Sequence, residues 1–170
     1  MSANLEDVQE AIKAIQTTTI VSCPIEPLAV TGVSANTFTA GDAFGLLMEI
    51  KVPKRGVIVS ATFFNRDDEN SQFDLEIFRH KPGQVASEAA WTLSAGDNPY
   101  FVHELAFVDN DDHTATRTSK LTNIGVAYTA PDGAFWIQMV CRGTPDMASV
   151  DVNPMVQLQI QSFDPDFKES

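Results

Sequence analysis

Apolar and polar residues alternate along most of the chain after residue 43. A period of two is typical of strands that bury one face, and turn-forming residues separate the alternating segments. The sequence therefore predicts about eight strands, with one or two short strands in the segment before residue 44. The remaining strands are expected at 44–52, 57–64, 73–77, 101–107, 124–128, 135–141 and 156–160.

Antiparallel sheets with one face in a core produce this alternation. Two such sheets facing each other form a β-sandwich, and eight strands suit a jelly roll. We therefore expect an all-β fold, a jelly-roll-like antiparallel β-sandwich over residues 44–170. The long connections 83–99 and 108–121 are expected at one end of the sandwich, where they are candidate contact surfaces.

The first sixteen residues have helical periodicity instead. Leu5, Val8, Ile12 and Ile15 recur at spacings of three and four, which places them on one stripe of a helix. A helix this short is marginal alone in water, so the stripe is expected to pack on its own domain or on neighbouring copies. These four residues are the candidate interface for oligomer formation or docking.

Residues 17–43 are rich in Thr, Ser and Pro and have little period. Pro24 and Pro27 oppose a helix or a central strand in this stretch. We expect an extended arm with one or two short strands, lying along a surface of the protein itself or of a neighbour. The chain thus divides into a helix and arm at 1–43 and a sandwich domain at 44–170.

Composition and charge narrow the function. The chain has 170 residues, which suits one domain, and its 23 acidic and 11 basic residues give a net charge of −12. This charge argues against nucleic-acid binding, which needs a positive field. No apolar run approaches the ~20 residues that cross a bilayer, so no membrane partner is expected. The N-terminus lacks the features of a signal peptide, which indicates synthesis in a cytoplasm.

The best candidate for a metal site is the acidic turn Asp109, Asp111 and Asp112 with His113. Its spacing does not fit an EF-hand, which leaves an irregular calcium site or, more simply, a solvated turn. We found no pattern of residues that indicates catalysis, so we expect no enzyme, no metal and no cofactor. The cysteines, Cys23 and Cys141, are expected to be small buried residues rather than a disulfide.

Two other classes of function stay open at this point. Trp91, Tyr100 and Trp136 are candidates for stacking on sugars, and they favour a carbohydrate-binding module if they gather on one exposed face. A glycosidase-like enzyme on a sandwich would instead need two carboxylates about 5–9.5 Å apart in a cleft.

Three segments carry a resemblance to a known group of proteins. They are a strand that ends in Phe78 before Pro82, an Arg-Gly-Thr-Pro turn at 142–145, and the alternating final strand 155–160. Together they resemble small tailed-bacteriophage virion proteins found among head genes, over roughly residues 44–163. The Arg-Gly-Thr-Pro turn is the most specific of the three.

The resemblance implies a capsid decoration, cement or minor head protein and no catalytic residues. The expected partners are the major capsid protein and further copies of the chain, with a trimer the favoured oligomer. The expected location is the capsid surface of a virion, after synthesis in the cytoplasm of a bacterial host. The alternative is a carbohydrate- or receptor-binding β-sandwich of a phage fibre.

Overall fold

A computed structural model describes the chain at residues 5–6, 9, 18–24, 36–65, 70, 72–86, 89–108, 111–114, 116–147 and 154–164. Within these residues nearly all regular structure is β. Helical backbone is limited to Leu5, Glu6 and Gln9 and to the short 3-10 turn η1 (Asn98–Tyr100).

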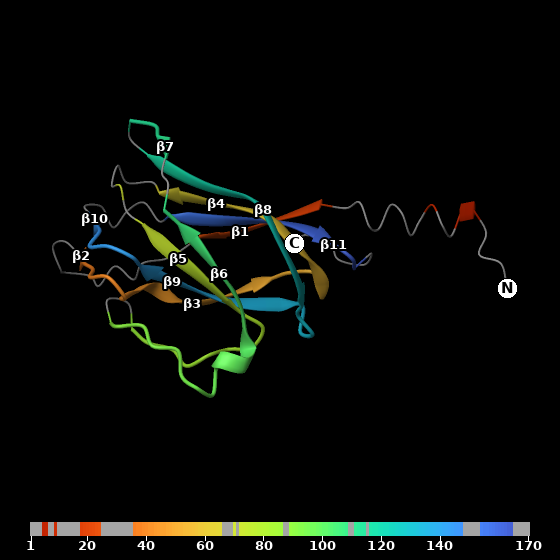
Figure 1. Ribbon diagram of the computed structural model, residues 1–170, viewed down its shortest axis with the longest axis horizontal. Coiled ribbons are helices and arrows are strands. Elements are labelled where there is room, and N and C mark those ends of the chain that lie inside the picture. Colours follow the sequence, from red (N-terminus) through yellow and green to blue (C-terminus); the bar gives the residue numbers. More distant parts are fainter. Residues whose placement is uncertain are drawn as a thin grey trace.

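Two antiparallel sheets lie face to face (Figure 1). The first has the order β1 (Thr18–Pro24), β11 (Met155–Ser162), β4 (Arg55–Asn65), β8 (Arg117–Thr129) and β7 (Asp111–Asp112). The second has the order β3 (Ala43–Lys51), β9 (Ala134–Cys141), β5 (Phe73–Phe78) and β6 (Phe101–Phe107). A small separate ribbon pairs β2 (Asn36–Thr37) with β10 (Asp146–Met147).

The strand order is that of a jelly roll. Among the long strands, β1 pairs with β11, β3 with β9, β4 with β8, and β5 with β6. The first strand thus pairs with the last, the second with the seventh, and so on inward, as when a long hairpin is rolled into two sheets. The predicted all-β jelly-roll sandwich is therefore confirmed.

A layer of phenylalanine rings joins the two sheets. The Phe63 ring of β4 lies 5.1 Å from the Phe73 ring of β5 and 5.6 Å from the Phe107 ring of β6. The stack continues from Phe73 to Phe44 at 4.8 Å and from Phe44 to Phe38 at 4.9 Å. All five side chains are fully buried. Their spacing is within the range of favourable tilted ring pairs, so the stack stabilises the contact between the sheets.

Strict alternation of buried and exposed residues fails at two places because bulges interrupt the strands. In β3 the pairing register shifts between Phe44 and Met48, and Gly45 takes a positive φ of 75° there. Such a bulge reverses the facing of the next residues, so Leu47 is buried whereas Leu46 is only partly buried. A second shift lies between Ile77 and Phe78. Strict alternation would place Phe101 on the core face with Leu105, but Phe101 instead pairs with Phe78 on the outer side.

The predicted loop 108–121 is also partly wrong. β8 begins at Arg117, so residues 117–121 extend a sheet and pair with the end of β4. Asn123 and Gly125 have positive φ values of 57° and 69°, at the point where the register of this long strand shifts. The sequence suggested only the second half of the strand, because this irregular stretch breaks the period of two.

The stretch 17–43, expected to be an extended arm with one or two short strands, contains β1 and β2 among its described residues. β1 lies along the protein's own surface, because it pairs with β11 over seven residue pairs from Thr18–Gln161 to Pro24–Met155. The segment before residue 44 therefore contributes a strand, β1, to a sheet of the sandwich.

Replacing Phe63 with alanine should lower the free energy of unfolding by about 3–5 kcal/mol, because it opens a cavity between the two sheets. Urea denaturation followed by fluorescence measures the loss. Phe163→Ala is the matched control: the Phe163 side chain is 41% exposed, so we expect a change within about 0.5 kcal/mol. Equal losses in the two variants would contradict the assigned core.

Candidate interaction surfaces

On the outer side of the β1-β11-β4-β8 sheet, the described residues form a broad surface without a carboxylate. Register and burial place sixteen described residues on it, none of them buried. We call this surface the carboxylate-free face. Its residues are Ile20, Ser22, Arg55, Val57, Ser60, Thr62, Phe64, Thr118, Lys120, Thr122, Ala127, Thr129, Met155, Gln157, Gln159 and Gln161.

Side chains on this face are aligned in rows across the strands. One row runs from Ile20 through Gln159 and Ser60 to Thr122. The Ser60 hydroxyl donates a 2.7 Å hydrogen bond to Oε1 of Gln159, and in the next row Gln157 Nε2 donates to the Ser22 hydroxyl at 3.1 Å. The Gln157 and Gln159 amides are thus held by neighbouring strands, and the described surface carries no carboxylate and is partly apolar.

The outer side of the other sheet has the opposite character. Asp74 and Glu76 of β5 lie beside β6, where Glu76 stands directly opposite Glu104. Arg142, just beyond β9, binds the Asp74 carboxylate and lies 3.4 Å from Glu104 Oε1. We call this surface the acidic face. The pKa of Arg142 is raised, first by its hydrogen bond to Asp74.

The β5–β6 connection covers part of the acidic face (Figure 1). It runs beside the edge of β3, where Trp91 N–H donates to Gly41 O at 2.8 Å and Ala43 N–H donates to Ala89 O at 2.9 Å. Loop 83–99, expected at one end of the sandwich, therefore lies along a sheet instead. Edge strands expose unpaired backbone groups, and this contact satisfies those at the start of β3.

Trp91 fastens this connection to the sheet. Its Nε1–H donates a 2.9 Å hydrogen bond to Glu76 Oε2, and its ring lies edge-on to Phe78 at 6.2 Å. Phe78 also meets the ring of Phe101 at 5.6 Å and is fully buried although it belongs to the outer side. Burial under this cover raises the pKa of Glu76, the Trp91 hydrogen bond lowers it, and the charges of Glu104 and Asp74 raise it further.

The three aromatic residues considered for sugar binding all lie on this side of the molecule, but their rings have protein partners. Trp91 is engaged by Glu76 and Phe78, as described above. Lys81 Nζ lies 4.9 Å from the centre of the Trp136 ring. Tyr100 is 40% exposed and packs edge-on against His80 at 4.8 Å. Together they do not form an open stacking platform.

The acidic turn considered for calcium is braced by the protein itself. Asp112 Oδ2 lies 3.2 Å from the guanidinium of Arg117, and Asp112 Oδ1 accepts the Thr114 N–H at 2.8 Å. His113 Nε2 is hydrogen-bonded to the Thr118 hydroxyl at 2.9 Å. Asp109 lies outside the described residues. In the described part of the chain, no three His, Cys, Asp or Glu residues gather closely enough to hold a metal ion.

Cys141 is a free, buried thiol, and burial raises its pKa to about 12. Such a thiol behaves as a small apolar core residue, as expected from the sequence. The side chain of Cys23 lies outside the described residues.

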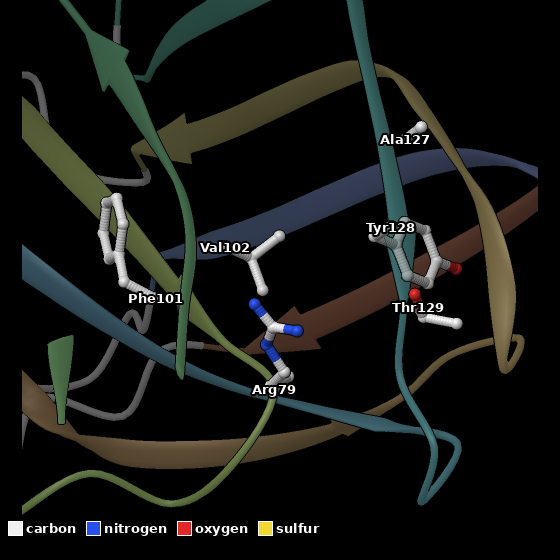
Figure 2. Close-up of a pocket in the computed structure, with 6 residues that line it drawn as sticks. All are labelled: Arg79, Phe101, Val102, Ala127, Tyr128 and Thr129. Atoms are coloured by element: carbon white, nitrogen blue, oxygen red, sulfur yellow. The ribbon is translucent and has the colours of Figure 1, made fainter. Parts of the chain in front are cut away.

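A shallow pocket of about 180 Å³ opens between the edges of β6 and β8. Figure 2 shows Arg79 extending from the end of β5 toward Val102, with Tyr128 and Thr129 across from it on β8. A second pocket, of about 200 Å³, lies beside Phe64 and Arg117. Both are smaller than the roughly 300–1,000 Å³ of typical small-molecule sites.

The predicted N-terminal stripe falls mostly outside the described residues. Leu5 has helical backbone and is 75% exposed, whereas Val8, Ile12 and Ile15 are not described. The stripe therefore stays a prediction. Among the described residues, no helix is both long and apolar enough to span a bilayer.

Sequence reasoning did not find the carboxylate-free face. One signal was present: Gln157, Gln159 and Gln161 occupy the outward positions of the last strand, where an acidic protein would be expected to place carboxylates. Apart from Met155 on the same strand, the remaining members come from three other strands, and only the strand order brings them together.

Comparison with known proteins found similarity at the level of solved structures only. A chain in the X-ray structure of Tomato aspermy virus is 11% identical with a TM-score of 0.34, over 91% of this chain and 81% of that chain. A chain in the full particle of Israeli acute paralysis virus heated to 63 degrees is 12% identical with a TM-score of 0.30, over 94% and 78%. Both scores are low, so the fold is assigned from the strand order itself.

No protein-family model matches the chain, and no curated protein matches it. The resemblance to tailed-phage virion proteins therefore stays a prediction.

Replacing Glu76 with glutamine should stabilise the protein at neutral pH. Because the pKa of Glu76 is raised on folding above its ordinary value of 4.5, its ionised form costs stability at pH 7, and this cost disappears as the pH falls toward that value. Glutamine still accepts the Trp91 N–H and removes the like charge opposite Glu104. We expect a gain of under about 1 kcal/mol at pH 7.

Thermal unfolding at several pH values measures this gain, which should shrink as the pH is lowered. Glu49→Gln is the matched control, because Glu49 is exposed and pairs with exposed Lys51, and we expect almost no change there. A Glu76→Gln variant that is less stable than the wild type, or whose gain is the same at acid pH, would show that the environment of Glu76 is wrongly described.

Proposed function

We propose that the protein is a structural virion component, a decoration or cement protein that binds a phage head and bridges capsid subunits. The observation that supports this most strongly is that one rigid sandwich presents two broad faces of unlike chemistry. The carboxylate-free face lies on one sheet, and Asp74, Glu76 and Glu104 lie on the other. Two unlike faces on a stiff body can hold two different neighbours at once, which is what bridging requires.

The mechanism is mechanical and includes no chemical reaction. Many copies bind the shell, and the summed contacts oppose its expansion by packaged DNA. Specific protein interfaces bury roughly 1,600 Å² in total, an area available to a body with two sheet faces. The net charge of −12 keeps the unbound protein soluble until it docks. The major capsid protein and further copies of this chain are the partners, and the capsid surface is the location.

The second candidate is a carbohydrate- or receptor-binding module of a phage fibre. Its support is that Trp91, Tyr100 and Trp136 lie on the same side of the molecule and that Tyr100 is 40% exposed. Two observations weigh against it: the Trp91 N–H is donated to Glu76, and Lys81 covers the Trp136 ring. If the fibre function holds, Tyr100→Ala and Trp136→Ala should abolish attachment to host cells.

The direct test is to mix the purified full chain with purified shells of the virus that encodes it and to measure co-sedimentation. We expect saturable binding with a fixed number of copies per shell, and shells that resist heat or dilution better when decorated. Failure to bind shells, or binding that never saturates, would contradict the proposed function.

Deleting residues 1–16 should weaken docking or assembly more than it weakens folding. The reason is the predicted stripe that includes Leu5, whose side chain is 75% exposed in the isolated chain. We expect shell binding or self-association about tenfold weaker or more, a difference of about 1.4 kcal/mol, with a nearly unchanged melting temperature. A truncated chain that melts early but docks normally would refute the role of the stripe.

A further inference from the structure

We propose that the carboxylate-free face binds the same face of a second copy of this chain. This deepens the proposed function by naming the partner of one of its two faces. The contact would be isologous: each residue meets the same set of residues on the other copy, related by a two-fold axis.

The distribution of charge identifies the occupant. The chain carries 23 acidic residues, yet none of the sixteen residues of this face is acidic, and its charged members are Arg55 and Lys120. The row that contains Phe64 and Thr118 reaches a carboxylate only beyond the face, at Asp111 of β7, which pairs with Thr118. A basic partner would be expected to dock on a surface that carries carboxylates. A second copy of this acidic chain is repelled by carboxylates, so it is expected to dock where the surface has none.

The acidic face, on the opposite side of the molecule, is not free of carboxylates. There Glu76 faces Glu104, Asp74 lies beside them, and Arg142 offsets only part of the charge. The β5–β6 connection also covers part of that surface. Two copies that met through the acidic face would bring these carboxylates together, so self-association is favoured on the other sheet.

The area of the face is large enough for a specific dimer. Four strands spaced about 4.8 Å apart and about eight residues long, at about 3.3 Å per residue, give a footprint of roughly 500 Å². Two copies would then bury about 1,000 Å² or more in total, the lower bound for a specific interface. The apolar members, among them Ile20 at 48% exposure, supply area that loses water on contact.

The experiment is sedimentation velocity of the full chain over a range of concentrations, with Gln159→Glu and Thr122→Glu combined in one variant. Both side chains are exposed and lie in the same row of the face. A carboxylate at position 159 still accepts the Ser60 hydroxyl, so the fold is expected to remain intact. Circular dichroism and thermal melting check this, and Gln159→Glu alone serves if the double variant is unstable.

We expect the wild type to dimerise and the variant to dissociate with a Kd at least about tenfold higher. High salt should restore part of the association, because it screens the new repulsion. Gln84→Glu is the matched control: it makes the same chemical change at an exposed position in the β5–β6 connection and should leave the dimer unchanged.

A wild type that stays monomeric would overturn the inference, as would a double variant that associates as well as Gln84→Glu does. An oligomer that is lost on deleting residues 1–16 and is insensitive to Gln159→Glu would also overturn it. The proposed function is tested separately. A chain that dimerises through this face but does not bind shells would support the inference and contradict the virion role.

Discussion

The contact between the two sheets is the interaction on which the rest of the structure depends. Phe63 belongs to one sheet, and Phe73 and Phe107 belong to the other, so their rings lock the layers together. Side chains alternate across a strand, and burying one set of positions therefore fixes the other set on the outside. The composition of both outer surfaces follows from the core, because a slip of one residue in any strand would exchange the two sets.

The two outer surfaces differ in their cover and in their charge. On one sheet a long connection crosses the edge of β3, and Trp91 anchors it to a half-buried Glu76. On the other sheet, the rows of Gln, Ser and Thr side chains lie without a carboxylate among them. A body built this way is suited to adhesion on two sides. The fold alone does not select a function, since jelly rolls serve in viral shells, lectins and enzymes. The chemistry of these two surfaces is what favours a structural role.

Most of the fold could be predicted from the sequence, because the period of two is strong in strands such as β5 and β11. The errors fall where the period breaks. Gly45 allows a bulge that buries Leu47, and the irregular stretch near Asn123 hid the first half of β8. The carboxylate-free face could not be predicted, since its members meet only through the pairing of strands distant in sequence. The N-terminal stripe remains a sequence-based prediction.

An electron cryomicroscopy map of the assembled particle, with this chain fitted at its bound position, tests the central claim most directly. Our account predicts that the outer side of the β1-β11-β4-β8 sheet lies against another copy of the chain, while a different neighbour contacts the acidic side. A map in which Gln159 and Thr122 face open solvent, or in which the chain is absent from the particle, would contradict it.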